Sequence, residues 1–259
     1  MNFNARKILK IFFVNFDKKF FAKFFWRQHP EAALRYLPVV TVLKKKGLVD
    51  SKILEIGPGS LGIIPYLKKP IDGLDVDFSG PATSLLTKIK GSAENLPFRK
   101  NSYDVVISVD VLEHLPGQNR QKAIYEMLRV AKKLAIIVVP VGDLSGAQDR
   151  ELDSLWRKIF GGSNQFLAEH VKNGLPTQDQ ILVYLDKSKR LLKKNVKVSS
   201  APLLNLQVRQ LLMRTWISKN KFLYYLYLKG YLLLVPLLAL SNFGNCYRRI
   251  FVIEFTPNP

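Results

Sequence analysis

Cysteine is almost absent from the sequence, since Cys246 is the only one among 259 residues. A single cysteine cannot form an internal disulfide, and a metal site built on several thiolates is excluded. We therefore expect a reducing compartment and a cytoplasmic location. The N-terminus does not have the pattern of a secretory signal, because the early apolar run Ile11–Val14 is soon followed by Asp17, Lys18 and Lys19.

Acidic residues are missing from one long segment. Lys187–Ile253 carries 13 basic residues and no acidic one, and residues 1–30 carry seven basic residues and one acidic residue. Between these flanks, Ile53–Asp153 is nearly neutral, with 12 basic and 13 acidic residues. The net charge of +20 therefore predicts docking of the flanks on an anionic partner, either nucleic acid or the inner face of a membrane.

The middle of the chain alternates between strand-like and helix-like segments. Apolar runs bounded by turn residues predict strands over Lys52–Ile56, Ile71–Asp77, Lys88–Ser92, Tyr103–Asp110, Leu134–Val141, Val196–Ser200 and Arg249–Phe255. Helical spacing predicts helices over Glu31–Lys46, Arg120–Lys133, Asp149–Phe160 and Gln178–Leu185. This alternation predicts an α/β fold with a mostly parallel, Rossmann-like, doubly wound sheet covered on both faces.

The flanks contain basic helical segments with many aromatic residues. Asp17 is a candidate cap for a helix over Lys18–Gln28, in which four phenylalanines share one face, namely Phe20, Phe21, Phe24 and Phe25. In Glu31–Lys46, Pro38 is a candidate kink and Gly47 a stop. Packing on the core and contact with a membrane are equally good interpretations of this N-terminal region.

A second apolar and basic region lies before the last strand. Leu203–Ser218 and Phe222–Leu240 have the composition of segments that lie at a membrane interface. Lys229, near the centre of Phe222–Leu240, would cost about 3 kcal/mol inside a bilayer, which favours lying on the surface over spanning. The alternative is a lid on the sheet. We divide the chain into N-terminal helices (1–46), a sheet domain (47–200), a helical insertion (201–247) and a last strand (248–259).

The first predicted strand leads into a glycine-rich turn. Gly57, Gly59 and Gly62 follow it in the pattern G-x-G-x-x-G, and Asp75 comes 18 residues after Gly57, at the end of the next strand. Glycines permit a tight turn and close approach of a ligand, while a carboxylate can bind ribose hydroxyls. This pattern alone fits a dinucleotide equally well.

Three further features turn the prediction toward another cofactor. Glu55 suits a cationic amino group better than a pyrophosphate, Gly91–Phe98 has the sequence GSAENLPF, and Tyr103–Leu115 has the sequence YDVVISVDVLEHL. With these blocks, residues 47–141 resemble the class I S-adenosylmethionine-dependent methyltransferases that act on small molecules. The resemblance implies a seven-stranded sheet whose last strand, at Arg249–Phe255, is antiparallel, with S-adenosylmethionine as the cofactor.

The resemblance also implies roles for residues of the glycine turn. Glu55, Gly57, Pro58 and Gly59 match the turn that holds the methionine part, and Gly62 opens the following helix, which Pro65 is expected to shorten.

The resemblance assigns the rest of the cofactor to three other strand ends. Asp75 matches the ribose ligand, with Asp77 as a close rival. Ala93 and Glu94 match the turn beside adenine, where Ser92 stands at a position the family often gives to Asp. The strand end beneath the sulfonium is matched by Asp110, Val111 and Leu112.

A base for an oxygen acceptor is sought among three residues. His114 is the first candidate because its ordinary pKa lies near neutrality, His170 is the second and Asp143 the third. Single polar residues at turns more often bond to local backbone, so Asp110, Glu113 and His114 also have a purely structural interpretation.

The absence of two sequence motifs narrows the choice of methyl acceptor. The fourth strand is not followed by N-P-P-Y or D-P-P-Y, and Cys246 is far from the position of a cytosine nucleophile. We therefore predict methyl transfer to a small or lipid-linked acceptor, such as a glycan, lipid or quinone-like molecule, at an anionic membrane surface. The alternatives are an RNA methyltransferase that grips phosphates with its basic flanks and a non-catalytic binding protein with this fold. The oligomeric state is left open.

Overall fold

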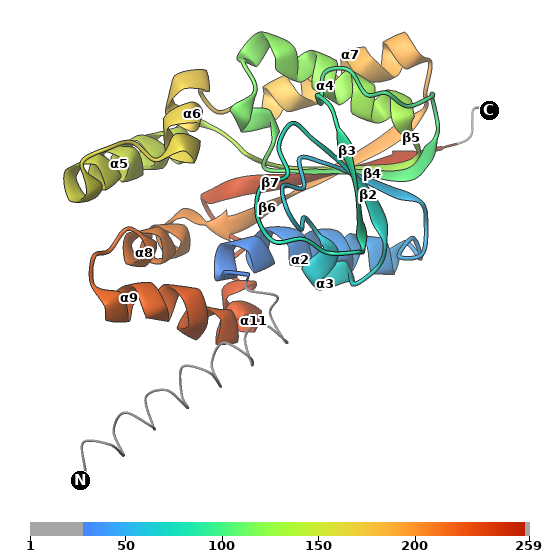
Figure 1. The fold of residues 1–259 in the computed structure, drawn as a ribbon. Helices are drawn as coiled ribbons and strands as arrows, with labels where there is room; N and C mark the ends of the chain where they lie inside the picture. The colour runs from blue at the N-terminus through green and yellow to red at the C-terminus, as the bar shows by residue number, and fades with distance from the viewer. Residues whose placement is uncertain (1–27, 257–259) are drawn as a thin grey trace.

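The computed structural model describes residues 28–256, which form a central sheet with helices on both faces (Figure 1). The predicted helix over Lys18–Gln28, with its four phenylalanines and the proposed cap Asp17, lies outside the described residues except for Gln28. Residues 257–259 also lie outside them.

The sheet has seven strands in the order β3-β2-β1-β4-β5-β7-β6. They are β1 (Ile53–Ile56), β2 (Ile71–Asp75), β3 (Leu86–Lys90), β4 (Tyr103–Val109), β5 (Ala131–Pro140), β6 (Val196–Asn205) and β7 (Cys246–Phe255). Strands β1 to β5 pair in parallel, whereas β7 is antiparallel to both β5 and β6. The predicted Rossmann-like fold with an antiparallel last strand is confirmed.

Two pairs of helices cover the sheet (Figure 1). Helices α2 (Pro30–Lys45) and α3 (Ile64–Leu67) pack on one face through apolar residues such as Val39, Leu43 and Ile64. On the other face lie α4 (Gly117–Val130) and α7 (Gln178–Leu192). The buried strand residues therefore have apolar partners on both sides, as a parallel sheet requires.

The remaining helices lie beyond the carboxyl edge of the parallel strands and the β6–β7 end of the sheet. They are the 3₁₀ turn η1 (Leu112–His114), α5 (Asp143–Phe160), α6 (Gln165–Asn173), α8 (Leu206–Trp216), α9 (Lys221–Tyr225), the π turn η2 (Leu226–Gly230), α10 (Tyr231–Leu233) and α11 (Val235–Leu238). In Figure 1, α8, α9 and α11 lie together at one end of the molecule.

Helices α2 and α3 each contain proline. Helix α2 begins at Pro30 after the N-cap His29, whose Nδ1 accepts a hydrogen bond from the backbone N–H of Ala32, and it continues through Pro38 to Lys45. Helix α3 is only four residues long and has Pro65 in its first turn, so the expected shortening is confirmed.

The predicted start of the helix after β5 was wrong. Helix α5 begins at Asp143 rather than Asp149, directly after Gly142, whose φ of 85° turns the chain out of the strand. Asp143 then lies in the first turn, where a carboxylate interacts favourably with the helix dipole.

Residues Leu203–Asn205 belong to a strand, not to the predicted helix over Leu203–Ser218. Strand β6 continues past Ser200 because its partner β7 begins early, at Cys246, so that Asn205 pairs with Cys246. The side chain of Asn205 then caps α8 by accepting from Gln207 and Val208.

The segment Phe222–Leu240 is not one continuous helix. It is divided into α9, the π turn η2, α10 and α11, with Pro236 in the first turn of α11. Within residues 28–256, none of the helices has both the length and the apolar character needed to cross a membrane.

Candidate functional site

The glycine turn between β1 and α3 forms the floor of the candidate site. Gly57, Gly59 and Gly62 have φ values of 71°, 56° and 52°, a left-handed conformation that favours glycine. A Cβ on Gly57 would lie 2.3 Å from Cγ2 of Val111, and one on Gly62 would lie 2.1 Å from Oε2 of Glu55. The Pro58 carbonyl closes the turn by accepting a 2.9 Å hydrogen bond from Gly62 N–H.

Glu55 lies beneath this turn with its carboxylate fully buried. Its Oε2 accepts a 2.8 Å hydrogen bond from Ile63 N–H, whereas Oε1 has no hydrogen-bond partner. Burial raises the pKa of Glu55 to about 7. An unpartnered oxygen on a buried carboxylate is a place for a donor or a cation.

Asp75 ends β2 and faces the same turn. Its Oδ2 accepts from Gly59 N–H at 2.7 Å, and its Oδ1 accepts from Asp77 N–H at 3.2 Å. Each carboxylate oxygen has a further lone pair, so Asp75 can still accept from two ligand hydroxyls. Asp77, the predicted rival, is exposed and accepts from Ser79 N–H within its own turn.

Ser92, Ala93 and Glu94 form the turn after β3. The Ser92 hydroxyl accepts from Glu94 N–H at 3.2 Å, and Ala93 is buried in the core. The Glu94 Oε1 accepts from the side-chain amide of Asn119 at 3.0 Å. Hydrogen bonds within the turn and to α4 thus fix this segment.

The carboxylate of Asp110 is bound by two arginines. Arg248 Nη2 and Arg35 Nη1 lie 2.7 and 2.9 Å from Oδ2, and Asp110 itself has a φ of 52°. Burial alone would raise the pKa of Asp110, but Arg248 and Arg35 hold it far below its usual range. The other two residues that were predicted to lie beneath the sulfonium are Val111 and Leu112. Val111 packs on the glycine turn, and Leu112 is buried in the core.

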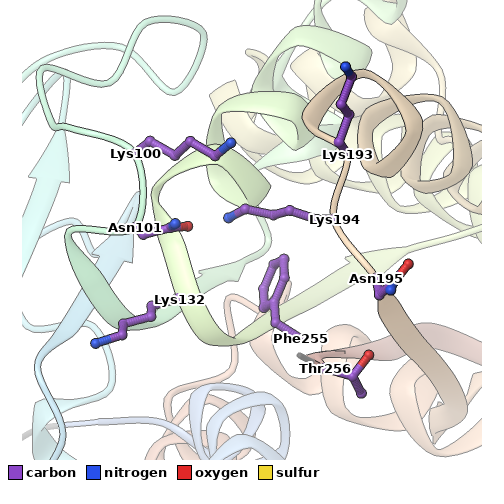
Figure 2. A pocket seen from close by; sticks show the side chains of 8 residues that line it. All are labelled: Lys100, Asn101, Lys132, Lys193, Lys194, Asn195, Phe255 and Thr256. Atoms are coloured by element: carbon purple, nitrogen blue, oxygen red, sulfur yellow. The ribbon is translucent and has the colours of Figure 1, made fainter. Parts of the chain in front are cut away.

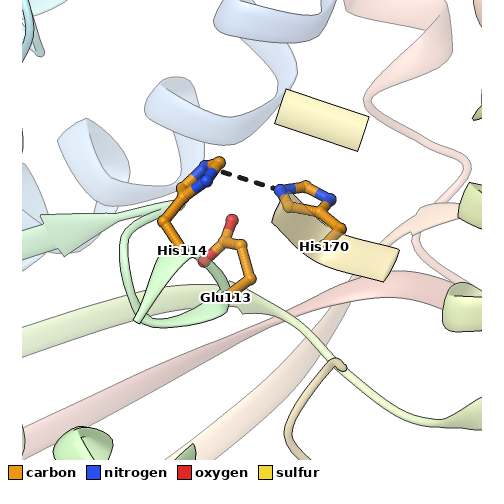
Figure 3. Close-up of side chains that lie close together, drawn as sticks. All are labelled: Glu113, His114 and His170. Atoms are coloured by element: carbon orange, nitrogen blue, oxygen red, sulfur yellow. Dashed lines mark hydrogen bonds between the residues drawn. The ribbon is translucent and has the colours of Figure 1, made fainter. Parts of the chain in front are cut away.

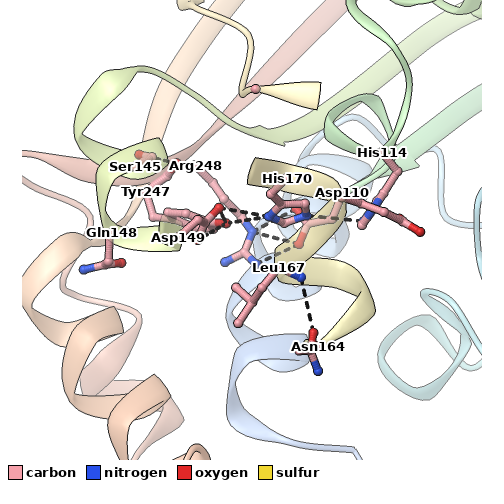
Figure 4. A network of polar contacts seen from close by, with 12 residues as sticks. Asp110, His114, Ser145, Gln148, Asp149, Asn164, Leu167, His170, Tyr247 and Arg248 are labelled. Atoms are coloured by element: carbon pink, nitrogen blue, oxygen red, sulfur yellow. Dashed lines mark hydrogen bonds and ion pairs between the residues drawn. The ribbon is translucent and has the colours of Figure 1, made fainter. Parts of the chain in front are cut away.

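His114 and His170 face each other beside this strand end (Figure 4). Their Nε2 atoms are 3.4 Å apart, and each Nδ1 contacts a carboxylate, Glu169 for His114 and Asp149 for His170. Burial, followed by the charge of His170, lowers the pKa of His114, although Glu169 acts in the opposite direction.

The third predicted base lies apart from these two. Asp143 is exposed in the first turn of α5, and no hydrogen bond or ion pair within residues 28–256 joins it to either histidine. The structure therefore brings together His114 and His170 but not Asp143.

Sequence reasoning missed the arginines and the carboxylates that organise this region. Arg248 in the apolar strand β7, Arg35 on α2 and Arg209 on α8 are all bonded to carboxylates. The available signal was a charge within an otherwise apolar segment, because a buried charge requires a partner.

A lysine-lined hollow of about 250 Å³ lies at the opposite edge of the sheet (Figure 2). It is lined by Lys100, Asn101, Lys132, Lys193, Lys194, Asn195, Phe255 and Thr256. Lys194 spans it and donates to the carbonyls of Leu128 and Ala131. None of the predicted site residues lines this hollow.

Comparisons with known proteins agree with this geometry. Residues 54–139 match the family model of the methyltransferase domain. A tRNA (carboxymethyluridine(34)-5-O)-methyltransferase of Arabidopsis thaliana is 30% identical over 146 residues, which are 56% of this chain and 34% of that protein. The chain spans about a third to two fifths of the length of the curated relatives it matches.

Solved structures share the fold at low sequence identity. A SAM-dependent methyltransferase of Thermotoga maritima is 17% identical with a TM-score of 0.50, over 94% of this chain and 97% of that one. The phosphoethanolamine N-methyltransferase 2 of Haemonchus contortus, in complex with S-adenosylhomocysteine, is 17% identical with a TM-score of 0.50, over 85% of this chain and 52% of that one.

Residues 54–139 are therefore a methyltransferase domain, and the chain has the fold of S-adenosylmethionine-dependent methyltransferases. The residues present fit that cofactor, because the space beside Gly59 is open and Glu55 Oε1 is buried without a hydrogen-bond partner. Bound S-adenosylmethionine supplies a methyl group already activated on a sulfonium.

Proposed function

We propose that the chain transfers the methyl group of S-adenosylmethionine to a small or lipid-linked acceptor, such as a glycan, lipid or quinone-like molecule, at an anionic membrane surface. In this proposal Glu55 binds the amino group of the cofactor, the backbone of Gly57 and Gly59 lies against its methionine part, and Asp75 accepts from its ribose hydroxyls. Holding the cofactor and acceptor in line lowers the barrier mainly by alignment.

The observation that carries the membrane part is an exposed apolar surface on α8–α11 and the following turn. Its exposed side chains are Leu211, Phe222, Tyr224, Tyr225, Leu233, Leu234, Leu237, Leu240 and Phe243. We call this set the α8–α11 surface. The opposite side of the same helices packs on α2 through Leu212, Tyr227, Tyr231 and Val235.

Charge supports a lipid occupant for the α8–α11 surface. Lys219 and Lys221 are exposed beside Phe222, and the whole segment Lys187–Ile253 contains no acidic residue. Aromatic and aliphatic side chains next to lysines match the boundary between lipid tails and anionic headgroups. A large exposed apolar patch is also rare on a protein that does not use it for binding.

Sedimentation with vesicles tests this proposal. The double variant Phe222→Ser/Leu240→Ser should bind phosphatidylserine-containing vesicles at least tenfold more weakly, since each lost apolar contact is worth about 1–3 kcal/mol. The matched control is Leu191→Ser on α7, because Leu191 is 71% exposed, as Phe222 is, but lies away from the α8–α11 surface. Equal vesicle binding by the double variant and the control would contradict the membrane proposal.

RNA is the second candidate partner, favoured by the similarity to a plant tRNA methyltransferase. Binding to RNA would rest on the basic flanks, and its affinity would fall steeply with salt because phosphate contacts release counterions. Salt-sensitive binding to RNA without vesicle binding would favour this candidate over the lipid-linked acceptor.

A further inference from the structure

Three metal-ligating side chains converge beside the end of β4 (Figure 3). Glu113 and His114 lie on the 3₁₀ turn η1, and His170 lies on α6. One potential ligand atom from each lies within 4.8 Å of the other two. Glu113 and His114 are adjacent in the sequence, and the fold brings His170, more than fifty positions away, to them.

The orientation of both histidine rings is fixed by carboxylates. Nδ1 of His114 is 2.7 Å from Glu169 Oε2, and Nδ1 of His170 is 2.9 Å from Asp149 Oδ2. Because an ionised carboxylate only accepts, each Nδ1 carries a hydrogen and donates it, which leaves each Nε2 as the ring nitrogen that can bind an ion. Histidines that bind metals are typically held in this way by a carboxylate behind them.

The two Nε2 atoms point at each other at 3.4 Å. The two nitrogens can share a proton at this distance or bind the same cation. Two nitrogens bound to one tetrahedral zinc ion at about 2.0–2.1 Å lie about 3.3 Å apart. The observed spacing therefore matches two ligands of a single ion.

Glu113 supplies the third ligand and an independent observation. Its side chain is fully buried, and neither carboxylate oxygen has a hydrogen-bond partner. The neighbouring Arg120 makes no hydrogen bond to Glu113, and its Nε and Nη2 donate to the carbonyls of Leu112, Leu115, Asn173 and Gly174. A buried carboxylate without a partner is costly, and a bound cation would provide the missing interaction.

We propose that Glu113, His114 and His170 bind one divalent transition-metal ion, such as zinc. Two imidazole nitrogens and one carboxylate oxygen suit these ions, and three protein ligands leave a coordination position open. Turn η1 directly follows Val111, which packs on the glycine turn at Gly57, so an ion held here would lie close to that turn.

The role of this ion rests on the proposed function. The open coordination position would receive the acceptor oxygen. A metal-bound hydroxyl loses its proton to solvent more readily. The oxygen lone pair then forms the new O–C bond while the C–S bond breaks and its electron pair stays on sulfur. His114 would act as a ligand in this arrangement, since ligation uses the lone pair that a base needs.

Titration of the metal-free full-length protein with Co²⁺ and Zn²⁺ tests the site without cofactor or acceptor. We expect one equivalent to bind, with a visible Co²⁺ spectrum and shifted ¹⁵N resonances of both Nε2 atoms. Glu113→Gln and His170→Ala should each weaken binding at least a hundredfold, and Glu169→Gln, behind His114, about tenfold. The matched control is His29→Asn, which removes the remaining histidine of the three in the chain and should bind as the wild type does.

Two results would overturn the proposal. One is a wild-type protein whose Nε2 resonances do not respond to either ion, which would mean that the histidines share a proton. The other is unchanged affinity in Glu113→Gln, judged together with Glu169→Gln if the first variant does not fold. Failure of methyl transfer with metal bound would count against the proposed function only.

Discussion

His29 shows how one side chain links the N-terminal helix to the late helices. Its Nδ1 caps α2 at Ala32 and also lies 3.1 Å from the hydroxyl of Tyr227 on η2. Burial, followed by the charge of Arg35, lowers the pKa of His29 to about 4, although Glu31 acts in the opposite direction. The folded protein therefore keeps this ring neutral under conditions in which an unfolded chain protonates it.

The stability of the fold should depend on pH through this residue. Well above pH 6.5, His29 is neutral in both states and has no effect on stability. As the pH falls toward 4, the unfolded state binds a proton that the folded state does not, so stability declines. Urea unfolding should show that His29→Asn, which keeps a capping acceptor, loses about 2 kcal/mol less than the wild type between pH 7 and pH 5. Parallel pH curves for the two proteins would assign the dependence to other groups.

Among the elements, the glycine turn between β1 and α3 should affect cofactor binding most directly. S-adenosylmethionine at a hundredfold excess over its dissociation constant should stabilise the wild type by about 2.7 kcal/mol. Gly57→Ala should abolish this effect, because its Cβ would lie 2.3 Å from Val111 in the turn that faces the ligand. The matched control Gly47→Ala has a φ of 66° and no atom within 4 Å, so it should carry a similar backbone strain and keep the stabilisation. Stabilisation by NADH in place of S-adenosylmethionine would contradict the cofactor assignment.

The sequence was sufficient to predict the sheet but not the ends of its elements. Buried parallel strands are continuous apolar runs, and β1, β4 and β5 are recognisable for that reason. Strand β6 extends to Asn205 only because β7 lies beside it, and that pairing joins residues about 40 positions apart. Apolar composition also favoured one long segment over Phe222–Leu240, which the π turn η2 and the break before α11 divide into short helices.

In the candidate site, too, some features could be predicted from the sequence and others could not. The glycine turn could be predicted because its conformational demand is local, three glycines at positive φ after a buried strand. The partners of Asp110, His114 and His170 could not, since Arg248, Glu169 and Asp149 are distant in sequence and meet them only in the folded chain. Asp143 and Asp77, which were also predicted as site residues, lie exposed.

At the scale of the whole molecule, a buried network of charges joins elements from both ends of the chain. Three arginines, Arg35, Arg209 and Arg248, are bonded to three carboxylates, Glu31, Asp110 and Asp149. These six residues lie on α2, at the end of β4, on α5, on α8 and on β7. Their charges balance, which is the condition under which buried ions are tolerated.

Replacing Arg248, which belongs to this network, should lower the free energy of unfolding far more than replacing Arg249 beside it. Arg248→Met leaves Asp110 and Glu31 short of a cation and should lower the free energy of unfolding by about 3–5 kcal/mol. Arg249→Met, the next residue of β7, lies outside the network and should cost about 1 kcal/mol or less. The double variant Glu31→Gln/Arg248→Met keeps the Arg35–Asp110 and Arg209–Asp149 pairs, so its cost should fall short of the sum of the single costs by more than 1 kcal/mol. Urea unfolding of the four variants measures these values, and additivity within about 0.5 kcal/mol would mean that the charges act independently.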